Sequence, residues 1–215
     1  CAGSCLLCPY SAQVLGTPMR GGTDMDTLGY WDAQYIELFR FACKEFPRDA
    51  RLYKVVADHI LYLVNSGIPA PKIVSDISPD AYEGKDQAVK DEAWTAVATW
   101  LREAPTAVSE HRGMRYLAER FAVDEERMRL VGFFFLYDRY ALFTELLNSA
   151  SEFKRTEFLR RFIGMPRNQL IEECRPSGSL VAAGILSNSC HPQLELNRFN
   201  VRISLSQYVS YFLDD

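Results

Sequence analysis

The stretch from Asp124 to Asn148, DEERMRLVGFFFLYDRYALFTELLN, decides the fold class. Asp124 and the two glutamates after it predict a helix start, because an N-cap oxygen accepts a bond from a free backbone N–H and negative charge suits that end of the helix dipole. Apolar residues from Leu130 to Leu147 then occupy almost every face. A helix that is apolar all round is packed by neighbours on several sides. We therefore expect one central helix, ending near Asn148, in a mainly α-helical protein.

Several amphipathic helices are expected before this central one. Residues 27–46 carry apolar residues at steps of three and four, and Asp49 is a candidate cap for the next helix, which ends near Asn65. A connector rich in proline and glycine follows, over 67–86. The helix that ends at Pro105 is expected to turn five residues toward the core, namely Ala88, Ala93, Val97, Trp100 and Leu101. A further helix is expected over 106–122.

The last third of the chain changes character. EFKRTEFLRRFIG (152–164) and RNQLIEEC (167–174) are two short helices across a tight turn, which is a helix-turn-helix outline. LELNRFNVRISLS (194–206) alternates loosely and predicts a strand or hairpin, and a closing helix follows. We expect a flexible lead-in over 1–26, a helical subdomain over 27–105, and a winged-helix-like subdomain with a small β-hairpin over 106–215.

Composition narrows the class of protein. The chain has 24 Lys and Arg against 28 Asp and Glu, a net charge of −4, and 48% hydrophobic residues. This is typical of a globular protein and lacks the basic excess of most nucleic-acid binders. We find neither a secretory signal nor an apolar run of the roughly 18 residues that a membrane helix needs, so we expect no membrane association. Six unevenly placed cysteines favour a reducing, cytoplasmic location. The chain begins with Cys rather than Met, and we expect it to be a fragment.

Three cysteines, Cys1, Cys5 and Cys8, open the chain with the C-x3-C-x2-C spacing of radical-SAM enzymes. That chemistry needs a parallel βα barrel, and the sequence shows no strand–helix alternation. Zinc is a better candidate, because Cys5 and Cys8 have ligand spacing and either Cys1 or the pair Cys190-His191 could complete a tetrahedral set. An acylated lipoprotein cysteine is a further alternative. Thiols without a ligand are the favoured interpretation.

The helix-turn-helix outline raises the possibility of DNA binding. Arg167, Asn168 and Gln169 start the second helix, and such side chains read bases in the major groove. Glu172 and Glu173 on the same helix would repel phosphates. The nucleic-acid candidates are Lys154, Arg155, Arg160, Arg161 and Arg167, and a winged-helix DNA-binding module is kept as an alternative that is not favoured.

The three histidines, His59, His111 and His191, lie far apart in the sequence. His59 is on an amphipathic helix, where a structural role is commoner than ligation. No catalytic Ser/His/Asp or Cys/His arrangement is legible from one sequence.

Three segments together resemble a known family. LAERFAVDEERMRLVGFFFLYDRY (117–140), FLRRFIGMPRNQLIEECRPSGSLVAAGILS (158–187) and LNRFNVRISLSQYVSYFLDD (196–215) resemble the region just before the nucleotide-binding module in a group of bacterial AAA+ ATPases. The likeness rests on an L-A-E-R stretch, an L-G-L-P-like turn and a P-x-G-x-L-x-x-x-G-[IL]-[IL] segment, and it covers residues 116–215.

The chemistry of that family lies in a P-loop, GxxxxGK[ST], which this chain lacks, as it lacks a Walker B strand. The resemblance therefore implies that this chain is no enzyme, and that ATP and Mg²⁺ bind only in a C-terminal module of the parent ATPase. It implies a non-catalytic recognition or regulatory domain that contacts a substrate protein, another partner or the ATPase module itself. A metal-binding protein that uses the N-terminal cysteines for zinc or an iron–sulfur cluster remains the other alternative.

Overall fold

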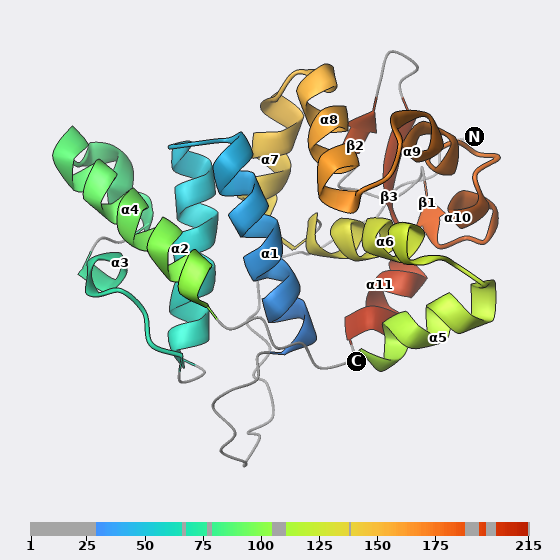
Figure 1. The fold of residues 1–215 in the computed structure, drawn as a ribbon, viewed down its shortest axis with the longest axis horizontal. Helices are drawn as coiled ribbons and strands as arrows, with labels where there is room; N and C mark the ends of the chain where they lie inside the picture. Colours follow the sequence, from blue (N-terminus) through green and yellow to red (C-terminus); the bar gives the residue numbers. More distant parts are fainter. Residues whose placement is uncertain are drawn as a thin grey trace, which may run out of the picture.

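The computed structural model describes residues 29–65, 68–76, 79–104, 111–137, 139–187, 194–196 and 201–214. These residues are mainly helical, as expected (Figure 1). The helices are α1 (Tyr30–Glu45), α2 (Ala50–Asn65), α3 (Lys72–Asp76), the 3₁₀ helix η1 (Pro79–Gly84), α4 (Gln87–Glu103), α5 (Arg112–Phe121), α6 (Glu125–Tyr137), α7 (Ala141–Ser149), α8 (Glu152–Ile163), α9 (Arg167–Glu173), α10 (Ser179–Ala182) and α11 (Gln207–Asp214).

The predicted central helix is in fact two helices. Every residue from Leu130 to Tyr137 is buried, so the prediction of a central core helix is confirmed for α6. The prediction that it continues to Asn148 is wrong, because α6 ends at Tyr137 and α7 begins at Ala141. The Thr144 hydroxyl donates to the Tyr137 carbonyl at 2.9 Å, and the Tyr140 carbonyl accepts the first amide bonds of α7. The break lets α7 pack against α2.

The early helices follow the sequence pattern, and the connector does not. The Asp49 carboxylate accepts a bond from the Arg51 backbone amide at 2.9 Å, which confirms the predicted cap. The connector expected over 67–86 is not wholly irregular, since it contains α3 and η1. A tertiary contact accounts for this order, because the ring of Tyr82 in η1 stacks on that of Tyr53 with centroids 3.8 Å apart.

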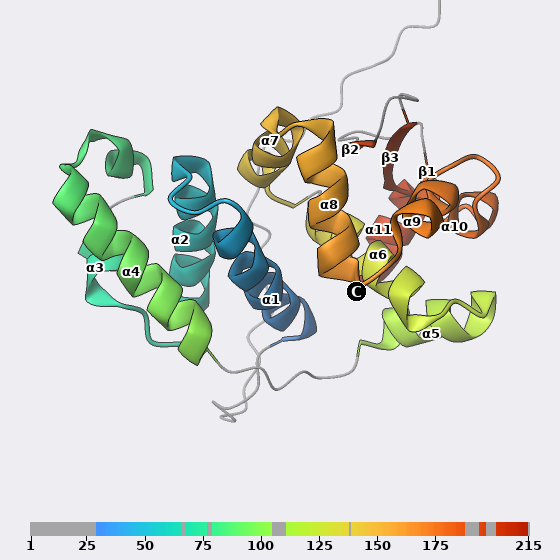
Figure 2. The same cartoon turned by 45° about the horizontal axis from the view of Figure 1, so that its top comes forward.

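One continuous buried cluster joins the predicted subdomains. It runs from Ala33 on α1 to Leu213 on α11. Helix α1 packs against α4, α6 and α8, and Figures 1 and 2 both show it between α2 and the region of α6 and α8. Described residues on both sides of the boundary predicted near residue 105 belong to this one cluster. Ala88, expected to face the core, is exposed in the first turn of α4.

In the part of the chain that the structure describes, three short strands precede α11. They are β1 (Leu186–Ser187), β2 (Leu194–Leu196) and β3 (Val201–Leu205), paired antiparallel in the order β1-β3-β2. Leu186 lies opposite Leu205, and Leu194 lies opposite Ile203. Helix α8 ends at Gly164, whose φ of +86° is a left-handed conformation that glycine adopts without steric cost.

Candidate functional site

The five basic residues predicted to contact nucleic acid do not form a free surface. Arg155 is only 8% exposed and donates to the Asn148 carbonyl at 2.8 Å. Arg160 pairs with Glu157 at 2.5 Å, and Arg161 pairs with Glu45 at 2.6 Å. Arg161 thus joins α8 to α1 and Arg155 joins α8 to α7, whereas the Arg160 pair lies within α8. Burial removes Arg155 from any surface that could meet a phosphate.

The other two basic candidates lie over aromatic rings. The Lys154 ammonium is 4.2 Å from the centroid of the Phe46 ring, and the Arg167 guanidinium is 5.9 Å from that of Phe153. Neither makes an ion pair within the described part of the chain. Arg160 lowers the pKa of the Glu157 carboxyl, and Arg167 still lies near enough to add to that effect.

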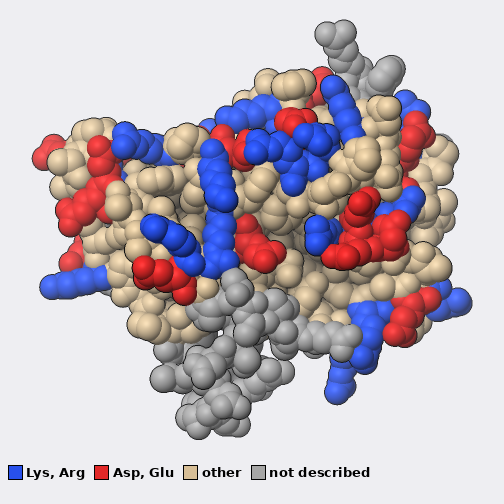
Figure 3. Space-filling view, in the orientation of Figure 1, with Lys and Arg blue, Asp and Glu red and all other residues tan. Residues whose placement is uncertain are grey.

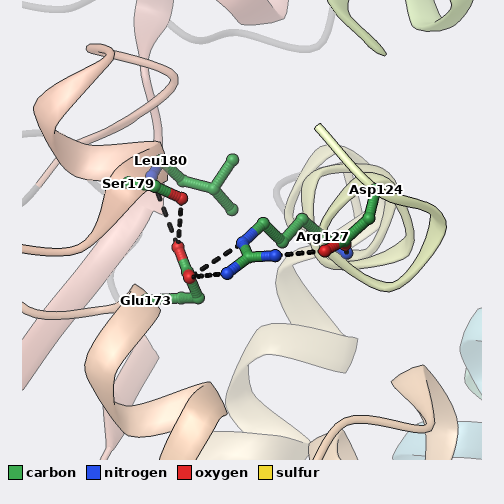
Figure 4. A network of polar contacts seen from close by, with 5 residues as sticks. All are labelled: Asp124, Arg127, Glu173, Ser179 and Leu180. Atoms are coloured by element: carbon green, nitrogen blue, oxygen red, sulfur yellow. Dashed lines mark hydrogen bonds and ion pairs between the residues drawn. The ribbon is translucent and has the colours of Figure 1, made fainter. Parts of the chain in front are cut away.

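Glu173 at the end of α9 is buried rather than on the surface. One carboxylate oxygen accepts from the Arg127 guanidinium at 2.7 and 2.8 Å, and the other accepts from the Ser179 hydroxyl at 2.7 Å and the Leu180 amide at 3.4 Å (Figure 4). Arg127 also pairs with Asp124. Burial alone would raise the pKa of Glu173, but these bonds and the Arg127 charge outweigh it and lower the pKa. Glu173 therefore cannot meet a phosphate as the sequence interpretation supposed, because it is buried and ties α6 to α9 and α10.

A second polar cluster lies at the joint of α1, α2 and α7. His59 is 1% exposed, with its Nδ1 2.8 Å from the Tyr140 hydroxyl and its Nε2 4.0 Å from the Asp32 carboxylate. Burial lowers the pKa of His59 to about 4 and raises that of Tyr140, so a neutral imidazole and a protonated hydroxyl share this hydrogen bond at neutral pH. This agrees with a structural role for His59. The sequence did not indicate Asp32 or Tyr140 as its neighbours.

The predicted metal ligands lie outside the described residues, namely Cys1, Cys5, Cys8 and the pair Cys190-His191. Within the described ranges, no group of His, Cys, Asp and Glu is arranged to hold a metal ion. Burial raises the pKa of the Cys43 and Cys174 thiols to about 12, so both are protonated at neutral pH. Among the helices that the structure describes, none has the length and apolar character to cross a membrane.

An open groove runs along α4. It encloses about 730 Å³ and is lined by Pro71 and a stripe of α4 from Asp91 to Glu103. Helix geometry explains the stripe. Ala93, Val97 and Leu101 recur every four residues and face the core, so the neighbouring rows of the same helix face outward. We call this hollow the α4 groove.

The walls of the α4 groove are held in place before any partner binds. Thr95, Ala96 and Thr99 are small and form its floor. Trp100, expected in the core, is half-buried and forms a wall. Its indole Nε1–H donates to the Pro69 carbonyl at 2.8 Å, so the ring is fixed to the segment before α3.

Carboxylates lie at both ends of the α4 groove. Asp91 and Glu92 are at one end and Glu103 is at the other. Asp91 lies 3.5 Å from Arg48, whereas Glu92 and Glu103 make no ion pair with any described residue. Acidic side chains gather at the left edge of the molecule, at the end of the fold where α4 lies (Figure 3). The arrangement offers small side chains and one tryptophan ring between two sources of negative charge.

Comparison with known proteins finds no matching family model, no matching curated protein and no matching solved structure. The site therefore has to be interpreted from its own geometry and from the resemblance in residues 116–215.

Proposed function

We propose that the chain is a non-catalytic, N-terminal recognition domain of a bacterial AAA+ ATPase, and that the α4 groove contacts a protein partner. The observation that carries the recognition role is the groove itself. Its small-residue floor, its Trp100 wall and its two charged ends are built on a helix whose opposite face is anchored in the core. Binding surfaces that are ordered in advance lose less entropy when a partner binds.

The C-terminal third supports the link to the ATPase family. The segments that carry the resemblance form α8, α9 and α10, followed by strands in the order β1-β3-β2. Helix α10 contacts both α9 and β1, so helices and sheet form one unit. We assign this unit a winged-helix-like fold as part of the proposal.

A protein partner is favoured over nucleic acid by the charges. Arg160 and Arg161 are neutralised by carboxylates, and Arg155 is buried. The groove carboxylates Glu92 and Glu103, which pair with no basic residue in the described ranges, would repel a phosphate backbone.

The contact between α11 and α1 offers a route for coupling to the ATPase. The Trp31 indole on α1 donates to the Leu213 carbonyl at 3.1 Å, and the Leu213 side chain is fully buried. In this proposal the ATPase module, with its ATP and Mg²⁺, follows residue 215. A movement of that module would pull on α11 and, through Trp31, on α1.

The reading frame tests the proposal. We expect the coding sequence beyond codon 215 to continue in frame into a GxxxxGK[ST] motif. The full-length protein should hydrolyse Mg-ATP, whereas the 215-residue chain should not. A stop codon, a following module without a P-loop, or hydrolysis by the 215-residue chain would contradict it.

A further inference from the structure

We propose that the partner of the α4 groove is an amphipathic helix with two basic residues about three turns apart. This rests on the proposed recognition function and adds the chemistry of the partner. The argument comes from the shape of the groove, from Trp100, and from the spacing of its carboxylates.

The shape of the groove suits a helix. Its lining follows one face of α4, where residues four apart form ridges parallel to one another. Thr95, Ala96 and Thr99 are small, which lets a second helix approach within the 8–10 Å typical of packed helices. A volume of about 730 Å³ in an open groove accommodates a row of side chains from such a helix.

Trp100 supplies the apolar anchor point. Its ring is half-buried and fixed by the bond to Pro69, so it presents a rigid face to the groove. Tryptophan in such a position is a common source of binding energy at interfaces, and its face also attracts Lys and Arg. An aliphatic side chain, or the stem of a lysine, would pack there.

The carboxylates set the charge of the partner. Glu92 and Glu103 are eleven residues apart on one helix, which corresponds to about 16 Å. Arg48 pairs with Asp91 rather than with either glutamate, and Arg102 donates to the Thr99 hydroxyl at 3.2 Å. A partner helix that runs alongside α4 and carries Lys or Arg eleven residues apart would meet both carboxylates, neither of which makes an ion pair with a residue that the structure describes. Such charges select the partner and its orientation more than they add affinity.

A charge-swap experiment tests this inference. The probe is a fluorescein-labelled synthetic helical peptide with leucines on one face and two lysines eleven residues apart. The matched control peptide has glutamate at those two positions. We expect the 215-residue chain to bind the lysine peptide on the order of tenfold more tightly, by fluorescence anisotropy. The double variant Glu92→Lys with Glu103→Lys should reverse this preference.

Two single variants complete the design. Trp100→Ala should weaken binding of the lysine peptide, on the order of tenfold, because the anchoring wall is lost. Glu119→Lys is the control for charge, since Glu119 is exposed on α5, away from the groove, and it should leave binding unchanged. Circular dichroism checks that each variant is folded.

Absence of binding to the lysine peptide, or an unchanged preference in the double variant, would overturn the inference. These outcomes differ from failure of the proposed function. If the double variant reverses the peptide preference but the reading frame contains no P-loop, then the α4 groove binds a basic helix and the ATPase assignment is wrong. If a P-loop is present and no peptide binds, then the ATPase assignment stands and the helix partner is wrong.

Discussion

The guanidinium of Arg127 on α6 lies 2.7 Å from the carboxylate of Glu173 on α9, across 46 residues of chain. The same carboxylate accepts a bond from Ser179 at the start of α10. Removing one partner of a buried ion pair leaves an unpaired charge in the interior, which is strongly destabilising. The packing of α6 against α9 and α10 should therefore depend on this contact.

Replacing Glu173 with Gln should destabilise the protein by about 3 kcal/mol, because the Arg127 guanidinium loses its main charged partner in a partly buried site. Urea unfolding followed by circular dichroism measures the change. Glu172→Gln is the matched control, since the neighbouring Glu172 is exposed and pairs only with Arg175. Its cost should be below about 1 kcal/mol. Equal losses of unfolding free energy in the two variants would show that the Glu173 contact stabilises the protein no more than the exposed Glu172 contact does.

Stability should fall in mild acid because of His59. Its pKa in the folded protein is about 4, below its ordinary value of 6.5, so the unfolded chain binds the proton more tightly. The contribution of neutral His59 to the free energy of unfolding is fully present above about pH 6.5. It is lost as the pH falls toward 4. The expected loss from this residue between pH 7 and pH 5 is about 2 kcal/mol.

Glutamine does not titrate, so the His59→Gln variant should lose about 2 kcal/mol less unfolding free energy than the wild type between pH 7 and pH 5. His111→Asn keeps an acceptor at the α5 cap and should retain most of the pH dependence. Urea unfolding at each pH measures the free energy of unfolding of each variant. If the free energy of unfolding changes with pH equally in the wild type and in His59→Gln, then His59 is not the source of the pH dependence.

Gly178 is required by close packing rather than by its backbone angles. A Cβ at this position would lie 2.3 Å from the Glu173 carbonyl oxygen and 2.5 Å from that of Glu172. Since both atoms are backbone, Gly178→Ala should cost about 1–3 kcal/mol or more. Gly84→Ala is the control, because a Cβ there meets nothing within 4 Å, and its effect should stay within about 0.5 kcal/mol. A similar melting temperature for both variants would contradict the packing argument.

Duplex DNA affinity should remain at the non-specific level, a Kd of about 10⁻⁴–10⁻⁶ M at physiological salt. The informative variant is Lys154→Glu with Arg167→Glu, which we expect to change this affinity little. Arg155→Glu is unsuitable, because Arg155 is buried and the variant would unfold. Nanomolar binding that Lys154→Glu with Arg167→Glu abolishes would instead establish the DNA-binding alternative.

The apolar pattern of the sequence predicts α6 as the core, yet it could not show that the helix ends at Tyr137. Apolar residues continue through Leu147, so nothing local marks a break. The break is accompanied by tertiary contacts, in which Tyr140 meets His59 and the Thr144 hydroxyl bonds the Tyr137 carbonyl.

The α4 groove could not be predicted from the sequence for a similar reason. A tryptophan beside Val97 and Leu101 is expected in the core, and only the bond from Trp100 to Pro69 shows that its ring lines a surface. Burial of Glu173 is not expected from the sequence, because charged side chains are rarely buried without a partner. Its burial depends on Arg127, which no local pattern connects to it.

The most direct test of the central claim is hydrogen exchange on the full-length protein in its ATP-bound and ADP-bound states. If the chain is the N-terminal domain of an AAA+ ATPase, then nucleotide should change amide protection in α11 and in the first turns of α1, which Trp31 joins to Leu213. Failure to bind ATP, or identical protection of both helices in the two states, would contradict the account.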